Sequence, residues 1–158
     1  MTTTIKGQDE FVTMKSEWFR EGEGFIIVYS ITTEESLVKD AVGFRNEILN
    51  EKGTNSVPMF TYAAPDFLVL AGNKCDLSDQ REVPTEKGQQ MAKQWLVMKK
   101  RFFYALCRDC PFYECSAKEK INLEAVFEQC VREIRKSLNH NDNNELTITE
   151  KKSCCVVL

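Results

Sequence analysis

The sequence predicts an α/β fold in which a mostly parallel sheet is flanked by helices. Three observations support this prediction: short apolar runs that indicate buried strands, helical periodicities placed between them, and polar loops directly after two of the runs. Strands that alternate with helices are typical of right-handed crossovers, which place neighbouring strands parallel. The polar loops should then share one rim, because parallel strands have their carboxyl ends at the same edge of a sheet.

Length and composition bound the class of protein. The 158 residues suffice for one domain with a tail, and a net charge of −3, from 21 Lys+Arg against 24 Asp+Glu, argues against a nucleic-acid binder. No apolar run approaches the length of a membrane span, and seven scattered cysteines indicate reduced thiols in a cytosolic protein. Cys107 and Cys110 have the spacing of half a zinc site, but no second pair stands at a matching distance, so we expect no metal there.

The first half of the chain alternates helix and strand. A mixed helical segment runs to Arg20, and residues 25–31 form a β-branched and aromatic run that indicates a buried strand. Residues 32–35 have the spacing of a capping box, in which Thr and Glu side chains satisfy backbone N–H groups at a helix start. Helical spacing continues in the apolar residues Leu37, Ala41, Phe44 and Ile48. We therefore expect a helix here and a second strand after it.

Residues 67–72 form that second strand, and the functional prediction rests on the loop directly after it. The apolar run breaks at a glycine and opens onto a polar loop that contains Asn73, Lys74 and Asp76. A carboxylate at Asp76 can accept two parallel hydrogen bonds from the ring N–H and exocyclic amine that guanine presents and adenine does not. Asn73 can tie the base edge to neighbouring backbone, and the stem of Lys74 can lie along the ring. A polar turn, in which Asn and Asp stand because they favour turns, explains the same residues.

Three further elements complete the alternation. The sequence predicts a helix over residues 85–105, a short strand over residues 112–115 and a closing helix over residues 123–138. The closing helix has the clearest pattern, since its apolar residues form a single stripe. The stripe consists of Leu123, Val126, Phe127, Cys130, Val131, Ile134 and Leu138.

The strand over residues 112–115 ends on Ser116, Ala117 and Lys118, which places a second loop on the rim already described. A small residue there lets backbone N–H groups approach a base carbonyl, and Lys118 can cover the ring from the second side. A strand-to-helix turn that contains a serine is the alternative interpretation.

The residues after 138 differ in character from the rest. Residues 139–150 are rich in asparagine and lack an apolar face, which predicts a flexible tether. The sequence closes with Cys155, two valines and a leucine, which fit a prenylation signal of the geranylgeranyl type, although an accidental apolar end is the alternative. Cys155 is the expected acceptor, and Cys154 is a second thiol for acylation. The expected organisation is thus a globular part at residues 1–138 and a tether with a lipid signal at residues 139–158.

Taken in order, five segments resemble the Ras family of small GTPases: residues 7–10, 22–25, 73–76, 116–118 and the prenylation signal. Residues 88–95 and 120–122 look most like the Rap branch, whereas Gln8 is the Ras-type residue at its position, so the choice between Ras and Rap stays open. The resemblance implies a P-loop NTPase-type G domain, which is a guanine-nucleotide switch that hydrolyses GTP to GDP.

The resemblance also implies roles for particular residues. Guanine would be held by the residues of both rim loops, namely Asn73, Lys74, Asp76, Ser116, Ala117 and Lys118. Gln8 would orient the attacking water, and residues 7–20 would be the second switch, through which effectors and regulators bind. Lipidation of Cys155 would hold the protein on the cytoplasmic face of the plasma membrane or an endomembrane.

The printed sequence departs from the family pattern where the phosphates bind. It contains no Gly-x4-Gly-Lys-Ser/Thr loop, since none of its seven glycines has another glycine five residues on. The first switch with its Mg²⁺-binding threonine is also absent, and Thr4 stands where the family has an Asp, so the usual Mg²⁺ ligands are missing. We therefore expect a G domain without its N-terminal strand, phosphate-binding loop and first helix. The strand at residues 25–31 would have an open edge, and the stripe of the last helix would be partly uncovered.

Two connections, at residues 59–66 and 96–109, exceed the usual family length by roughly ten residues each.

Whether the chain is an active GTPase therefore stays open, and two functions compete. One is a lipid-anchored GTP-binding switch, and the other is a lipid-anchored interaction module that neither binds nor hydrolyses nucleotide well. A third interpretation is a non-functional fragment from a misassigned or alternatively spliced gene.

Overall fold

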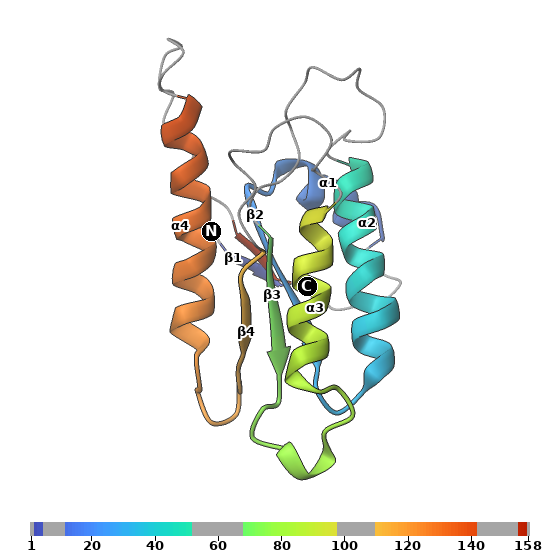
Figure 1. The fold of residues 1–158 in the computed structure, drawn as a ribbon. Helices are drawn as coiled ribbons and strands as arrows, with labels where there is room; N and C mark the ends of the chain where they lie inside the picture. The colour runs from blue at the N-terminus through green and yellow to red at the C-terminus, as the bar shows by residue number, and fades with distance from the viewer. Residues whose placement is uncertain (1, 5–11, 52–67, 98–109, 142–154, 158) are drawn as a thin grey trace.

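A computed structural model of the chain describes residues 2–4, 12–51, 68–97, 110–141 and 155–157 (Figure 1). Within these ranges the elements are β1 (Thr2–Thr4), α1 (Val12–Glu21), β2 (Gly24–Ser30), the π-helix η2 (Ser36–Ala41), α2 (Val42–Glu51), β3 (Leu68–Asn73), the 3₁₀ helix η3 (Ser78–Gln80), α3 (Thr85–Val97), β4 (Phe112–Glu114), α4 (Leu123–Asn141) and β5 (Cys155–Val157). None of the helices in these ranges is long and apolar enough to cross a membrane.

The described strands form one sheet in the order β1-β5-β2-β3-β4, and every neighbouring pair is parallel. β2 and β3 are in register over six positions, from Phe25 opposite Leu68 to Ser30 opposite Asn73. The two apolar runs therefore lie side by side, and the predicted α/β class with a mostly parallel sheet flanked by helices is confirmed.

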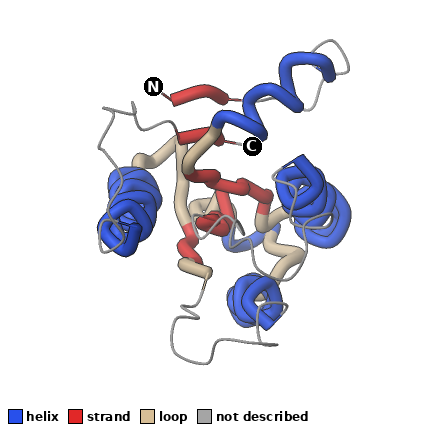
Figure 2. The backbone as a smooth tube through the Cα atoms, turned by 90° about the horizontal axis from the view of Figure 1, so that it is seen from above, coloured by secondary structure: helices blue, strands red, loops and turns tan. Residues whose placement is uncertain are grey.

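Helices cover both faces of the sheet (Figure 2). α1, α2 and α3 lie on one side, and α4 lies on the other (Figure 1). Along β2 the side chains alternate between these layers, because successive residues of a strand point to opposite faces. Phe25 and Ile27 belong to the core under α1 to α3, whereas Ile26 packs with Cys130 and Ile134 of α4. The stripe predicted for the closing helix thus faces the sheet.

Tyr29 lies where α3 crosses β2 and β3 at very close range. A Cβ atom on Gly88 of α3 would come within 2.4 Å of the Tyr29 hydroxyl, and a Cβ on Gly72 of β3 within 2.8 Å. Burial raises the pKa of Tyr29 to about 12, and its hydroxyl has no hydrogen-bond partner among the described residues. The absence of a side chain at Gly88 lets α3 approach Tyr29 this closely, and the absence of one at Gly72 leaves room for the same Tyr29 ring on β3.

The start of the helix after β2 differs from the prediction. Helical residues begin at Glu34, but no capping box forms at residues 32–35, since Glu35 makes no side-chain capping bond, and the π-helical turns of η2 follow. A distant side chain caps the helix instead: the Glu82 carboxylate accepts a hydrogen bond from the Glu34 N–H at 2.9 Å. The Ser36 hydroxyl accepts from the Ser30 N–H at 2.9 Å and donates to the Thr33 carbonyl at 2.6 Å, which ties the helix to the end of β2. The side-chain cap of this helix therefore comes from a residue far away in the sequence, and not from the local capping spacing.

The predicted open edge of the strand at residues 25–31 is wrong for its first part. β5 lies between β1 and β2, with Cys155 in register with Thr2 on one side and with Gly24 on the other. This strand is the dark red arrow behind β2 in Figure 1. Within the described residues, β2 has a neighbour on both sides up to Ile26. Beyond Ile26 its single neighbour among them is β3.

The closing helix is well covered on its central stripe and open on one flank. Val126, Cys130 and Ile134 are buried, whereas Phe127 is 40 % exposed, which agrees with the expectation of a partly uncovered stripe. α4 ends at Asn141, beyond the predicted end at residue 138. α3 is described to Val97, so the long connection at residues 59–66 and most of the one at residues 96–109 lie outside the described residues.

Candidate functional site

Both predicted polar loops lie at the carboxyl ends of adjacent parallel strands. β3 ends at Asn73 and β4 ends at Glu114. Backbone hydrogen bonds continue past the strand ends, because the Cys75 N–H donates to the Cys115 carbonyl at 3.0 Å and the Cys115 N–H donates to the Gly72 carbonyl at 2.8 Å. The prediction that the two loops share one rim is therefore confirmed.

One side-chain oxygen joins the two loops. The Asn73 Oδ1 atom accepts a hydrogen bond from the Lys74 N–H at 2.8 Å and another from the Ala117 N–H at 3.1 Å. The first bond holds the asparagine side chain against its own loop, and the second crosses to the loop after β4. An amide is suited to this position because its oxygen has two acceptor sites while its NH₂ group remains a donor.

The backbone turns sharply at Lys74, which has a φ of 68°. This left-handed conformation is unfavourable for a residue with a Cβ atom and costs of order 1 kcal/mol. It lets the Leu77 N–H donate to the Lys74 carbonyl at 2.9 Å, so that the loop reverses directly after the strand. The Lys74 side chain is exposed at the rim.

The Asp76 carboxyl is surrounded by groups that favour its ionised form. A hydrogen bond from the Ser116 hydroxyl lowers its pKa most, and Lys118 and Lys74 lower it further by their positive charges. Ser116 is completely buried, whereas Ala117 and Lys118 are exposed. The rim therefore presents a carboxylate that stays ionised at neutral pH, with a lysine from each loop close enough to stabilise it.

The loop after β4 is closed at its base and open at its tip. Ser116 and Ile121 exchange two backbone hydrogen bonds, at 3.1 and 3.0 Å, and the Ser116 hydroxyl accepts from the Glu119 N–H at 3.0 Å. Asn122 has a φ of 55° and donates from its side chain to the Glu114 carbonyl at 2.8 Å. These bonds hold Ala117 and the next residue at the loop tip, facing the loop after β3.

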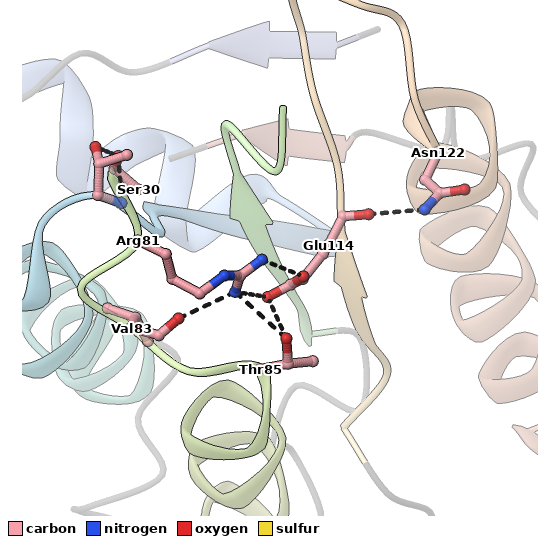
Figure 3. A network of polar contacts seen from close by, with 7 residues as sticks. Ser30, Arg81, Val83, Thr85, Glu114 and Asn122 are labelled. Atoms are coloured by element: carbon pink, nitrogen blue, oxygen red, sulfur yellow. Dashed lines mark hydrogen bonds and ion pairs between the residues drawn. The ribbon is translucent and has the colours of Figure 1, made fainter. Parts of the chain in front are cut away.

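An ion pair that no motif in the sequence predicts fixes the same two loops to each other (Figure 3). Arg81 donates to both oxygens of Glu114, at 2.6 and 3.0 Å, and the Arg81 Nη1 atom also donates to the Val83 carbonyl at 3.0 Å. The Thr85 hydroxyl donates to Glu114 at 3.1 Å. The Arg81 guanidinium holds the pKa of Glu114 below its usual value. Because Arg81 follows the first loop and Glu114 precedes the second, this pair positions both.

The remaining predicted site residues lie elsewhere. Gln8 and Cys154 fall outside the described residues, and Cys155 is part of β5. Of the predicted second switch, the structure describes only the part in α1, where the Lys15 ammonium lies 2.5 Å from Glu47 of α2. Among the described residues no three His, Cys, Asp or Glu side chains converge as a metal site requires.

The fold and the rim define an α/β domain with a ligand-type site at the carboxyl ends of its parallel strands. The Ras family profile matches residues 3–136, and the chain belongs to the Ras family. It is 37% identical to Ras-like protein rasS of Dictyostelium discoideum over 155 residues and 33% identical to Ras-like protein 2 of Mucor circinelloides f. lusitanicus over 154 residues. These matches cover 94% and 96% of this chain but 68% and 66% of the two relatives. The chain thus spans about two thirds of their length.

Proposed function

We propose that the chain binds the guanine base of GDP or GTP at this rim, as the base-recognition part of a Ras-type small GTPase switch. Family membership implies guanine-nucleotide binding in general. The observation that supports this site most directly is the double acceptor at Asn73, which holds the loops of residues 73–76 and 116–118 together at the distance of a hydrogen bond.

In this proposal Asp76 is the residue that discriminates between bases. Its pKa is lowered by Ser116 and by the flanking lysines, so it is an acceptor at neutral pH. Guanine offers it two parallel N–H donors, whereas adenine presents a ring acceptor at the corresponding edge, which leaves the carboxylate unpaired. The apolar stems of Lys74 and Lys118 cover the two faces of the base.

The wider activity follows the family. GTP hydrolysis to GDP, with Gln8 orienting the attacking water, is proposed for a protein that also carries a phosphate-binding loop, and the printed sequence contains no Gly-x4-Gly-Lys-Ser/Thr segment. Effectors and regulators would bind at residues 7–20. Lipidation of Cys155, with Cys154 as a second acceptor, would anchor the protein to the cytoplasmic face of a membrane.

Titration with a fluorescent GDP derivative tests base recognition. Removal of a carboxylate that makes two charge-assisted hydrogen bonds should weaken binding about 100-fold, so we expect that loss for Asp76→Ala. Asp79→Ala is the matched control, because Asp79 is exposed in the same connection and should leave affinity unchanged. Unlabelled GDP should displace the probe and ADP should not. Equal affinity of Asp76→Ala and the unmodified chain, or equal displacement by ADP, would contradict the proposal.

A second proposal, which applies to the chain only as printed, without a Gly-x4-Gly-Lys-Ser/Thr segment, is a lipid-anchored interaction module without nucleotide. The same titration separates the two. A chain that shows the circular dichroism of a folded α/β protein but binds no GDP derivative would support the module.

A further inference from the structure

β5 consists of the same residues that the proposed lipid signal requires. It comprises Cys155, the expected acceptor thiol, and the two valines after it. In the structure their backbone is paired on both sides, with Val156 in register with Thr3 of β1 and with Phe25 of β2. The sheet pairing and the proposed lipid signal therefore involve the same three residues.

The pairing of β5 with β2 suits the chemistry of both segments. Phe25 and Ile26, the register partners of the two valines, are 0% and 1% exposed. Valine has a high preference for strands, because its branched side chain packs well on a pleated and buried surface. The pairing also gives the first part of β2 the second neighbour that an apolar strand needs in order not to pair with other chains.

S-alkylation of Cys155 requires the opposite arrangement. Its thiolate displaces diphosphate from an isoprenyl diphosphate, so that a carbon–sulfur bond forms, diphosphate leaves and the thiol proton passes to solvent. The enzyme that catalyses this step must hold the residues around the thiol as a free extended segment. A strand whose N–H and C=O groups bond two neighbours cannot be held in that way until it leaves the sheet.

We propose that the sheet and the lipid compete for Cys155–Val157. While β5 is in place, the chain withholds its lipid signal. Release of β5 exposes Cys155 to modification and leaves a slot between β1 and β2. A three-residue strand opens more readily than the core of a sheet, so such release does not require global unfolding. The inference rests on the lipidation proposed above and adds to it a control that is built into the fold.

Backbone amide hydrogen exchange tests whether β5 is paired between β1 and β2, and this test does not involve a lipid. Val156→Pro removes one backbone N–H from β5. Because β5 lies between β1 and β2, the variant loses a hydrogen bond to one of these two strands. We expect exchange in a peptide that covers residues 24–30 to rise at least about 10-fold, with no change in a peptide over residues 112–114. Val156→Ile is the matched control and should behave as the unmodified chain. Equal exchange in the proline variant and the unmodified chain would overturn the proposal.

In vitro modification tests the competition. Geranylgeranyl diphosphate and its protein transferase are given three substrates: the full chain, the full-chain variant Thr2→Pro/Thr3→Pro, and a free peptide of residues 150–158. Adjacent residues of a strand direct their N–H groups to opposite sides, so the double variant removes one N–H that faces β5 while it keeps the lipid signal intact. We expect the peptide and the double variant to be modified at least about 10-fold faster than the unmodified chain.

The outcomes distinguish the two proposals. If the peptide is not modified, the lipidation itself is refuted, and the competition falls with it. If the peptide and the unmodified chain react at equal rates, lipidation stands and the competition is overturned. Slow reaction of the unmodified chain with fast reaction of the peptide and the double variant supports both.

Discussion

The ion pair between Arg81 and Glu114 leads to the most specific prediction. Both side chains are largely shielded, with exposed fractions of 23% and 19%, and the contact is bidentate. Glu114→Gln keeps the shape of the side chain and removes its charge. We expect this substitution to destabilise the fold, because Arg81 then loses its partner in a place where water replaces it poorly.

The expected coupling free energy of the Arg81–Glu114 pair lies between the values for exposed and for buried ion pairs. Exposed pairs contribute about 0.2–1 kcal/mol, and loss of one partner of a fully buried pair costs about 3–5 kcal/mol. Arg81 and Glu114 are about one-fifth exposed, so we expect a coupling free energy of about 2 kcal/mol. Glu128 and Arg132 of α4 provide the control, since both are 64% exposed and should show a coupling of only about 0.3–0.5 kcal/mol.

A double-mutant cycle in urea measures the coupling. The four proteins are the unmodified chain, Glu114→Gln, Arg81→Gln and the double variant. Because the pair lowers the pKa of Glu114 below its ordinary value of 4.5, the coupling should be complete above about pH 4.5 and should disappear as the pH falls through the lowered pKa. Additive effects of the two substitutions at pH 7, within about 0.5 kcal/mol, would refute the reasoning.

Three other predictions concern the core. Gly88→Ala should lower the free energy of unfolding in urea by about 1–3 kcal/mol, because the added Cβ would lie 2.4 Å from the Tyr29 hydroxyl. Gly43→Ala is its control and should raise the free energy of unfolding by about 0.5–1 kcal/mol, because nothing lies within 4 Å of the added atom. Ile134→Ala, which empties a buried site under α4, should cost about 2–5 kcal/mol in the same assay. Burial raises the pKa of Cys115 to about 11, so mass spectrometry after alkylation at pH 8 should find this thiol modified only in the unfolded chain.

The elements that the sequence predicted best are those whose pattern is local and strong. The strand at residues 25–31 and the run before Asn73 are bounded apolar segments, and the structure pairs them as β2 and β3. The stripe of the closing helix identified the face that α4 buries. The rim was also predictable, because parallel strands place their carboxyl ends together and both polar loops follow such strands.

The features that were not predicted depend on residues far apart in the chain. Arg81 and Glu114 have no common spacing or motif, and only the folded sheet brings them together. The N–H of Glu34, at the start of the helix after β2, is accepted by the Glu82 carboxylate, a contact that the capping spacing at residues 32–35 does not reveal. The residues around Cys155 indicate only a lipid signal when considered locally, since no local pattern reveals their pairing with β1 and β2.

The position of β5 in the sheet has a consequence for how the chain folds as it is made. β5 emerges from the ribosome after every strand with which it pairs, and among the described residues β1 pairs with β5 alone. At a synthesis rate of about 5–20 residues per second, β1 and the edge of β2 therefore wait for about 6–30 s while β3, β4 and α4 are added. During that interval the edge at Phe25 and Ile26 is the segment most open to a chaperone or to pairing with another nascent chain.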